Sequence, residues 1–276
     1  MLELNKVYHG DCLEVMKDID DESIDMVMAD PPYQITQCHW DSIIPLEPMW
    51  VQLKRVIKSN GAIVLMGSQP FTTTLISSNI EMFKHCWYWK KSNPSNIALV
   101  NKQPLKYHEN IVLFYQKQPT YNKQMIERDE LGKKRLQNKN NPIRFSGSEQ
   151  QGKKGFKKDY DINRYDVETK NPSSVLEIKV ERGKFHPTQK PVALMEYLIK
   201  TYTNEGDLVL DFCAGSGTTG VACRLINRNF IMIEKEQEYI TIIKQRLANP
   251  DYKQPKQKLN TEQGLLPENE IRKFLI

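Results

Sequence analysis

The stretch Asp207-Leu-Val-Leu-Asp-Phe-Cys-Ala-Gly-Ser-Gly-Thr-Thr-Gly220 decides the fold of this chain. Its first residues read as a buried strand, and the residues after Gly217 have the apolar spacing of a helix. Between them lies a G-x-G-x-x-G pattern, whose glycines permit a tight turn and a close approach of ligand to the helix amides. The next apolar run, Phe230-Ile-Met-Ile233, ends at Glu234, where a carboxylate can accept hydrogen bonds from ribose hydroxyls. The stretch therefore predicts a strand, a turn and a helix that bind a nucleotide-type ligand.

Both ends of the chain alternate between strand-like and helical patterns. Asp25–Ala29 and Gly61–Met66 have the composition of buried strands, and Leu46–Lys58 between them has helical spacing. Strands that alternate with helices favour a mostly parallel sheet with helices on both faces, which is an α/β fold. The further strands are expected at 85–89, 110–115, 207–211 and 230–233, and the further helices at 191–202, 218–226 and 237–248.

The segment from Lys117 to Lys184 has little periodicity and an excess of positive charge. It contains 17 Lys and Arg residues against 10 Asp and Glu residues. A structureless loop of this length is unusual inside a compact domain, so we expect a functional insertion or a small subdomain. Its charge suits a polyanion such as nucleic acid, or it only keeps an exposed insertion soluble. Charge alone leaves both interpretations open.

The composition of the whole chain limits its class. Its 276 residues suffice for one large α/β domain with a modest insertion, and residues 250–276 read as a polar tail. The apolar runs are too short to cross a bilayer and no apolar leader opens the chain, so we expect neither a membrane partner nor secretion. Five scattered cysteines without a C-x-x-C pair argue against disulfides and zinc, and for a reducing cytoplasm. We therefore expect no metal.

The tetrapeptide Asp30-Pro31-Pro32-Tyr33 directly follows the predicted strand Asp25–Ala29. The carboxyl end of a parallel strand is where α/β sheets bind their ligands, and each proline stiffens the residue before it in an extended conformation. Asp30 and the Pro31 carbonyl offer acceptors to the two N–H bonds of an aromatic amine, which frees the nitrogen lone pair for attack. Tyr33 offers a flat face to an unstacked base. The alternative is a stiff turn without chemistry.

By itself, the glycine pattern does not distinguish S-adenosylmethionine from a nicotinamide or flavin dinucleotide, but the chain as a whole resembles one family. Asp211–Thr219 resembles the cofactor motif of S-adenosylmethionine-dependent DNA amino-methyltransferases, and Asp30–Tyr33 resembles their catalytic motif. Phe185-His-Pro-Thr-Gln-Lys-Pro191 is similar to a third motif of these enzymes, and Gly10–Glu14 and Trp87–Pro94 resemble two further segments. The order, with the catalytic motif before the cofactor motif, resembles the permuted group called β.

The resemblance implies a fold and a division into parts. The expected fold is a Rossmann-like methyltransferase fold with a mixed, mostly parallel seven-stranded sheet. It is circularly permuted, so that the strand at 229–233 and a strand near Val7 are neighbours. Residues 1–116 are the expected catalytic part, 117–184 a basic insertion that serves as the target-recognition region, 185–249 the cofactor-binding part and 250–276 the tail.

The resemblance also implies the site residues. Glu234 is expected to bind the ribose of the cofactor and Asp11 to lie near its adenine, while Cys213 is structural because transfer to an exocyclic nitrogen needs no covalent nucleophile. The expected catalytic residues are Asp30, Pro31, Pro32 and Tyr33. The expected cofactor-binding residues are Asp11, His186, Pro187, Thr188, Gln189, Lys190, Asp211, Phe212, Cys213, Ala214, Gly215, Ser216, Gly217, Thr218, Thr219 and Glu234.

The activity that the resemblance implies is site-specific methylation of adenine N6 in double-stranded DNA, by base flipping and direct transfer from S-adenosylmethionine. Asp at the first catalytic position favours adenine, whereas Ser favours cytosine N4, so a cytosine-N4 enzyme is the nearest alternative. A dinucleotide-dependent oxidoreductase would leave Asp30–Tyr33 without a role, and a catalytically silent DNA-binding protein needs no two intact sites. A homodimer and a cognate restriction endonuclease are the further partners that the resemblance suggests.

Some neighbouring residues have a structural interpretation beside the functional one. Trp87 and Trp89, two positions apart on a strand, are more typical of a core than of base contact. Lys90 and Lys91 either meet phosphate or lie at an exposed strand end. Thr188 is placed to cap the helix that follows it.

Overall fold

The computed structural model describes residues 2–33, 42–137, 166–181, 185 and 189–248. The chain divides into two compact units. The first contains the described residues 2–122, 173–181, 185 and 189–248, and the second contains the described residues 123–137 and 166–172. Among the described residues, no helix has both the length and the apolar character that a membrane crossing requires.

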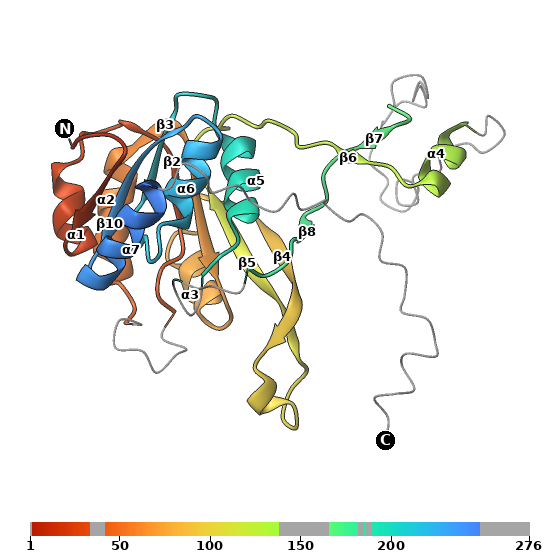
Figure 1. The fold of residues 1–276 in the computed structure, drawn as a ribbon, viewed down its shortest axis with the longest axis horizontal. Coiled ribbons are helices and arrows are strands. Elements are labelled where there is room, and N and C mark those ends of the chain that lie inside the picture. Colours follow the sequence, from red (N-terminus) through yellow and green to blue (C-terminus); the bar gives the residue numbers. More distant parts are fainter. Residues whose placement is uncertain (1, 34–41, 138–165, 182–184, 186–188, 249–276) are drawn as a thin grey trace. The chain divides into compact units, whose positions relative to one another are not determined.

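The first unit is built on an eight-stranded sheet with the order β1-β10-β9-β2-β3-β5-β4-β8 (Figure 1). The first five of these strands run parallel, β5 is antiparallel to both of its neighbours, and β8 is parallel to β4. The mostly parallel α/β sheet that the sequence predicts is therefore confirmed. The strands are β1 Lys6–His9, β2 Ile24–Ala29, β3 Ile57–Gly67, β4 Phe83–Ser95, β5 Lys106–Phe114, β8 Val175–Glu177, β9 Leu208–Asp211 and β10 Asn229–Glu234.

The expected number of seven strands is wrong, because β8 adds an eighth. Tyr88 and Lys90 of β4 pair with Val175 and Glu177 of β8, and the Tyr88 N–H donates to the Ser174 carbonyl at 2.8 Å. Without β8, this side of β4 would present unpaired backbone groups at a sheet edge. A strand of three residues is too short to give a periodic signal in the sequence.

The first and last strands along the chain lie side by side. Val7 of β1 pairs with Met232 of β10 in parallel. The prediction that a strand near Val7 borders the strand at 229–233 is therefore confirmed. The circular permutation itself stays a prediction.

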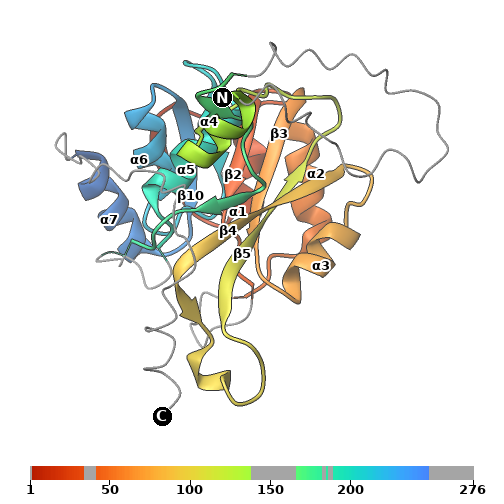
Figure 2. The ribbon, with the colours of Figure 1, turned by 90° about the vertical axis from the view of Figure 1, so that its right-hand side faces the viewer.

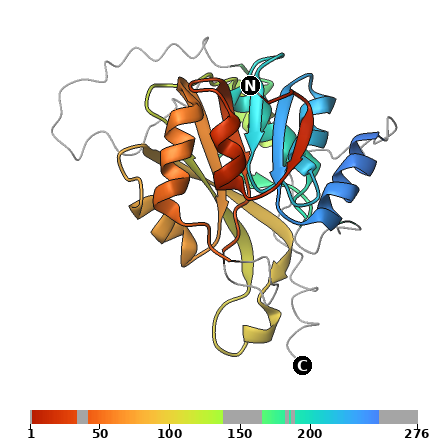
Figure 3. The same cartoon turned by 90° about the vertical axis from the view of Figure 1, so that its left-hand side faces the viewer.

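Helices cover both faces of the sheet, as Figures 2 and 3 show from two opposite sides. The red and orange helices α1 to α3 pack on one face, and the green and blue helices α5 to α7 pack on the other. The predicted helices are confirmed as α2, α5, α6 and α7, whereas α1 and α3 are too short for the periodicity to have shown them. The helices are α1 Cys12–Val15, α2 Leu46–Val56, α3 Phe71–Ser77, α5 Val192–Tyr202, α6 Thr218–Leu225 and α7 Gln237–Ala248.

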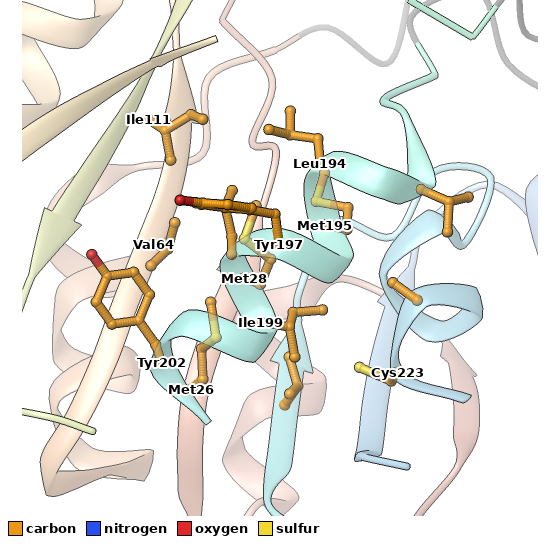
Figure 4. Packing of buried hydrophobic residues seen from close by; sticks show 14 of the residues in the cluster. Met26, Met28, Val64, Ile111, Leu194, Met195, Tyr197, Ile199, Tyr202 and Cys223 are labelled. Atoms are coloured by element: carbon orange, nitrogen blue, oxygen red, sulfur yellow. The ribbon is translucent and has the colours of Figure 1, made fainter. Parts of the chain in front are cut away.

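Alternation along β2 supplies a side chain to each of two cores. Met26 and Met28 face α5, where they pack with Met195 and Tyr202 (Figure 4). Val27 belongs to the core on the opposite face. Because each fully buried apolar side chain contributes roughly 1.5–3 kcal/mol, two-sided burial fixes the register of this strand and hence the position of Asp30, which follows it.

The second unit contains a two-stranded sheet and one helix. Strand β6 (Ile126–Glu127) pairs antiparallel with β7 (Thr169–Lys170), and α4 spans Glu130–Gln137. Lys133 of α4 forms an ion pair with Glu168. The residues that precede the second unit, up to Asn122, belong to the first unit. The Asn122 side-chain amide donates to the carbonyls of Lys200 and Thr203 at the end of α5. The compact part of the basic segment therefore begins after Asn122.

Candidate active site

A cavity of about 1010 Å³ lies at the carboxyl ends of β2, β9 and β10. It brings together the expected catalytic motif, most of the glycine-rich turn, and Asp11, Gln189, Lys190 and Glu234. His186, Pro187 and Thr188 lie outside the described residues. A cavity of this volume accommodates a nucleotide-sized ligand.

The glycine-rich turn between β9 and α6 has the conformation that its sequence predicts. Gly215 and Gly217 have φ angles of +51° and +76°, in the left-handed region that glycine adopts without strain. A Cβ on Gly217 would lie 2.9 Å from Ile243 of α7. A Cβ on Gly220 would lie 2.5 Å from the Met232 methyl group, so this glycine allows α6 to pack closely on β10.

Asp211 is the last residue of β9, and its carboxylate fixes the turn that follows. Its carboxylate accepts hydrogen bonds from the Cys213 N–H at 3.1 Å and the Thr219 hydroxyl at 2.6 Å. Among the described residues, those that donate hydrogen bonds to Asp211 carry no positive charge. Burial therefore raises the pKa of Asp211 to about 7. Burial also raises the pKa of the neighbouring Cys213 thiol, which keeps it protonated and agrees with a structural role.

Glu234 ends β10 and already fixes the turn from the other side. Its two carboxylate oxygens accept from the Gly215 N–H at 2.7 Å and the Glu236 N–H at 2.9 Å. Burial raises its pKa in spite of these bonds. Each oxygen retains a second acceptor direction, so the expected contact with ribose hydroxyls is chemically available and stays a prediction.

Two residues that the sequence reasoning did not single out complete this half of the site. Arg246 of α7 is buried and donates to the carbonyl and hydroxyl oxygens of Ser216 at 2.6 and 2.9 Å. Glu181 accepts from the Val192 N–H at 3.1 Å and thus caps α5. Pro191 occupies the N-cap position of this helix, and Thr188, which was expected to cap it, lies outside the described residues.

Asp11 closes the floor of the cavity at the start of α1. Its carboxylate accepts from the Leu13 N–H at 2.9 Å and caps that helix. The preceding Gly10 N–H donates to the Glu234 carbonyl at 3.0 Å, so the ends of β1 and β10 are tied together here. Asp11 and Glu234 line the same cavity, and the expected position of Asp11 near the adenine stays a prediction.

The catalytic tetrapeptide leaves β2 with Asp30 half-buried in the cavity. One oxygen of the Asp30 carboxylate accepts from the Tyr33 hydroxyl, and the other accepts from the Lys190 ammonium. The Tyr33 ring stacks on Phe71 of α3, with centroids 5.3 Å apart and planes inclined by 30°. Protein groups therefore occupy both oxygens that a base amine would use.

A chain of alternating charges continues from Asp30 into the sheet. Lys190 also lies 3.4 Å from a carboxylate oxygen of Glu109 on β5, and Lys91 of β4 lies 3.0 Å from the other oxygen. Both lysines are buried. Sequence reasoning missed Glu109, because nothing in its neighbourhood distinguishes it from a solvent-exposed acid on a strand.

Three groups in this cluster, Asp30, Lys190 and Glu109, have shifted pKa values. Burial raises the pKa of Asp30, and the nearby Lys190 ammonium offsets only part of that effect. Burial opposes the charge on Lys190, but Asp30 and Glu109 together outweigh it and raise the pKa of this ammonium. Burial likewise opposes the charge on Glu109, whose pKa is nevertheless lowered by Lys190 and Lys91. Of the two carboxyl groups in this cluster, Asp30 is therefore the one with a raised pKa.

The residues between Trp87 and Lys91 have separate roles. Trp87 and Trp89 are buried and donate to the Tyr202 hydroxyl and the Ile178 carbonyl, both at 2.8 Å, which confirms their structural interpretation. Lys90 is exposed and pairs with Glu177 at 2.8 Å. For Lys91 both expectations are wrong, because it is buried and paired with Glu109.

Within the described part of the chain, no three His, Cys, Asp or Glu side chains are grouped so that they could hold a metal. Cys12, Cys86, Cys213 and Cys223 have free thiols. The polar groups that line the cavity are carboxylates, ammonium groups, hydroxyls, thiols and amides. This set fits a cationic nucleoside ligand, since carboxylates line the cavity and glycines open its backbone.

The model of the DNA methylase family N6_N4_Mtase matches residues 24–245 of this chain. The chain belongs to this DNA methylase family. It is an enzyme of the DNA methyltransferase type, and its methyl donor is S-adenosylmethionine. The match extends from β2 to α7 and so includes both the catalytic tetrapeptide and the glycine-rich turn.

Individual relatives of this DNA methylase agree with the family. The type II methyltransferase M2.MboI of Moraxella bovis is 28% identical over 87% of this chain and 86% of its own length. The crystal structure of the M1.HpyAVI–SAM complex has 26% identity, with a TM-score of 0.57 over 87% of this chain and 98% of that one. The cytosine-N4-specific PvuII DNA methyltransferase shares the fold, with a TM-score of 0.62 and 18% identity over 90% of this chain and 87% of its own.

Proposed function

We propose that this methyltransferase modifies adenine N6 at a specific site in double-stranded DNA. The observation that carries the proposal is the Asp30 carboxylate, fixed at the end of β2 in the same cavity as the glycine-rich turn. An acceptor at this position suits an exocyclic amine, whose lone pair is delocalised into the ring until its N–H bonds are held out of plane. The relatives named as type II methyltransferases support a site-specific reaction on DNA.

The residues of the cavity divide the work between the two substrates. S-adenosylmethionine, held by the Gly215–Thr219 turn and Glu234, supplies an electrophilic methyl group on sulfur. The target base must leave the duplex to reach the cavity, because its amine is otherwise stacked and paired. Tyr33 then stacks on the base, and stacking of this kind contributes about 1–3 kcal/mol.

Asp30 acts on the amine itself. For its carboxylate to accept an amine N–H, either the Tyr33 hydroxyl or the Lys190 ammonium must yield its bond. Glu109 lies close enough to Lys190 to retain that ammonium when Asp30 turns to the base. S-adenosylmethionine would supply the methyl group for the new N–C bond and would keep the electron pair of its C–S bond on sulfur. The methylated nitrogen then loses one proton. Asp30 accepts this proton, or water accepts it directly.

Mass spectrometry of nucleosides tests the proposal directly. Unmethylated duplex DNA is incubated with the protein and S-adenosylmethionine, digested, and analysed for both methylated bases. We expect N6-methyladenine, and the same reaction with RNA as substrate serves as the control for nucleic-acid class. N4-methylcytosine alone would overturn the adenine assignment but keep the chemistry, since an acceptor at Asp30 fits either amine.

The basic segment at 117–184 is the proposed target-recognition region. Its lysines would neutralise phosphates, while polar side chains would read base edges in the major groove. Because Asn122 and Ser173 belong to the first unit, the deletion that tests this role removes residues 123–172 only. The deletion variant is expected to lose DNA binding and to keep its affinity for S-adenosylmethionine in calorimetry. Methylation of an unchanged site by that variant would show that the segment is only solvated surface.

We further propose a homodimer, a cognate restriction endonuclease and a cytoplasmic location for the enzyme. The free thiols of the described cysteines suit a reducing compartment. Light scattering of the purified protein tests the dimer, and cell fractionation tests the location. Expression beside a candidate endonuclease tests the partner, since methylation should protect the host DNA from cleavage.

A further inference from the structure

The long hairpin formed by β4 and β5 ends in a tip of unusual composition. It projects beyond the rest of the sheet in all three ribbon views, where it is the yellow element (Figures 1 to 3). Its tip is Ile97-Ala-Leu-Val100, a short 3₁₀ turn followed by one more residue. The side chains of Ile97, Leu99 and Val100 are 66%, 41% and 53% exposed. Loop tips are ordinarily polar, so a cluster of exposed aliphatic side chains marks a contact surface.

Hydrogen bonds hold the tip in one conformation. The Leu99 N–H donates to the Asn96 carbonyl at 2.9 Å, and the Lys102 N–H donates back to the Leu99 carbonyl at 2.8 Å. Asn96, with a φ of +63°, accepts from the Lys106 N–H at 2.8 Å and so joins the two sides of the hairpin. The aliphatic side chains are thus presented by an ordered turn, whose rigidity lowers the entropic cost of a contact.

The charge near the tip favours a polyanion as the partner. Lys102, two residues after Val100, is exposed, and no Asp or Glu lies between Lys90 and His108. The stem of the hairpin also borders the active site, since Asn93, Pro94 and Lys106 line the same cavity as Asp30. The hairpin therefore extends from the cavity that contains Asp30 to the exposed tip.

We propose that the tip residues Ile97, Leu99 and Val100 enter the duplex next to the target base and fill the space that the flipped base leaves. This inference rests on the proposed action on duplex DNA. Apolar side chains that wedge between base steps are a known means of opening a stack, and the exposed Lys102 beside the tip neutralises an adjacent phosphate. The wedge stabilises the open duplex, while Tyr33 stabilises the base on the cavity side.

The test replaces the tip by Ile97→Ser, Leu99→Ser and Val100→Ser together. The matched controls are Val51→Ser and Ile80→Ser, which remove equally exposed aliphatic side chains elsewhere on the first unit. Calorimetry with S-adenosylmethionine verifies that all variants are folded. Fluorescence anisotropy measures binding to duplex DNA, and single-turnover methylation is compared on a paired target and on the same target opposite a mismatch.

We expect the tip variant to methylate the paired target about tenfold more slowly than the wild type, with weaker DNA binding, and the controls to be unchanged. The defect should shrink on the mismatched target, because a mismatched base costs less to flip. Equal DNA binding and equal rates for the tip variant and the wild type would overturn the wedge. Loss of a dimer in light scattering, with unchanged DNA binding, would assign the tip to a second copy instead. If the wild type methylates no DNA, the proposed function fails, and the anisotropy comparison still decides the tip's contact with DNA.

Discussion

The two halves of the active site hold their carboxylates in different ways. In the cofactor half, Asp211 and Glu234 accept hydrogen bonds from backbone N–H groups and a hydroxyl. In the catalytic half, Asp30 and Glu109 contact the ammonium groups of Lys190 and Lys91. Neutral donors fix the position of a carboxylate without balancing its charge, so burial raises the pKa of Asp211 to about 7.

This difference follows from what each half must do. The glycine-rich turn needs a fixed geometry, and bonds to the backbone supply it because they cannot exchange partners without a change of fold. In the proposed reaction, the catalytic half must release a carboxylate to an incoming base. A lysine with two carboxylates in reach can leave one for the other, and the total charge of the chain stays balanced as it does so.

Removal of the Asp30 carboxylate should have the largest effect. Asp30→Ala is expected to slow single-turnover methylation about 10³-fold, since it removes an acceptor whose hydrogen bond strengthens toward the transition state. Affinities for S-adenosylmethionine and DNA should change little. Asp18→Ala, at an exposed acid of the same unit, is the control. Full activity in Asp30→Ala would mean that the tetrapeptide is only a stiff turn.

Asp211→Asn should change how stability depends on pH. The folded pKa of about 7 exceeds the ordinary value of 3.8, so the stability that Asp211 contributes is fully present below about pH 4 and is lost as pH rises through 7. Relative to Asp211→Asn, the wild type should therefore lose at most about 4 kcal/mol of unfolding free energy across this window. Urea unfolding of both proteins between pH 4 and 8 measures it, with Glu205→Gln as an exposed control. Parallel pH curves would show that Asp211 is ionised in the folded state throughout.

Lys190→Met should separate the catalytic half from the cofactor half. Without the ammonium, the pKa of Asp30 rises further, because burial remains and the nearby positive charge is gone. The acidic limb of the pH–rate profile should move to higher pH, with a rate about tenfold lower at pH 7. Lys90→Met, which removes an exposed lysine of β4, should leave the pH–rate profile unchanged. A uniform loss of rate at every pH would assign Lys190 to cofactor binding alone.

Gly220→Ala should have the smallest effect of the four and should act on the cofactor half only. The new Cβ would meet the Met232 side chain at 2.5 Å, and the end of a methionine side chain can move aside. We expect a loss of about 1–2 kcal/mol of unfolding free energy, with a modestly weaker affinity for S-adenosylmethionine. Substitution of Met232 by Ala in the same protein should recover part of the affinity. No recovery would indicate that the helix, rather than the methionine, limits the space.

The sequence predicted the elements on which the site is built. The glycine pattern between β9 and α6, the strand before Asp30 and the order of strands and helices were all readable, because each depends on residues within one short window. β8 and Arg246 were not, since their roles arise from partners that are distant along the chain, and Glu181 was not, since it caps α5 from a segment without a periodic pattern. Lys91 was misread for the same reason: a strand position gives no sign of a carboxylate on the next strand.

By itself, the sequence of this protein determined an α/β methyltransferase with its catalytic and cofactor motifs at the ends of parallel strands. Local patterns suffice for the α/β fold because strand, turn and helix are set by neighbouring residues, whereas the methyltransferase activity followed from the resemblance of several motifs to one family. The tertiary structure alone decided that Lys190 reaches Asp30 and that Glu109 and Lys91 continue the chain of charges. Those contacts join β2, β4, β5 and the segment before α5, and only the packing of the sheet brings such distant positions within the range of an ion pair.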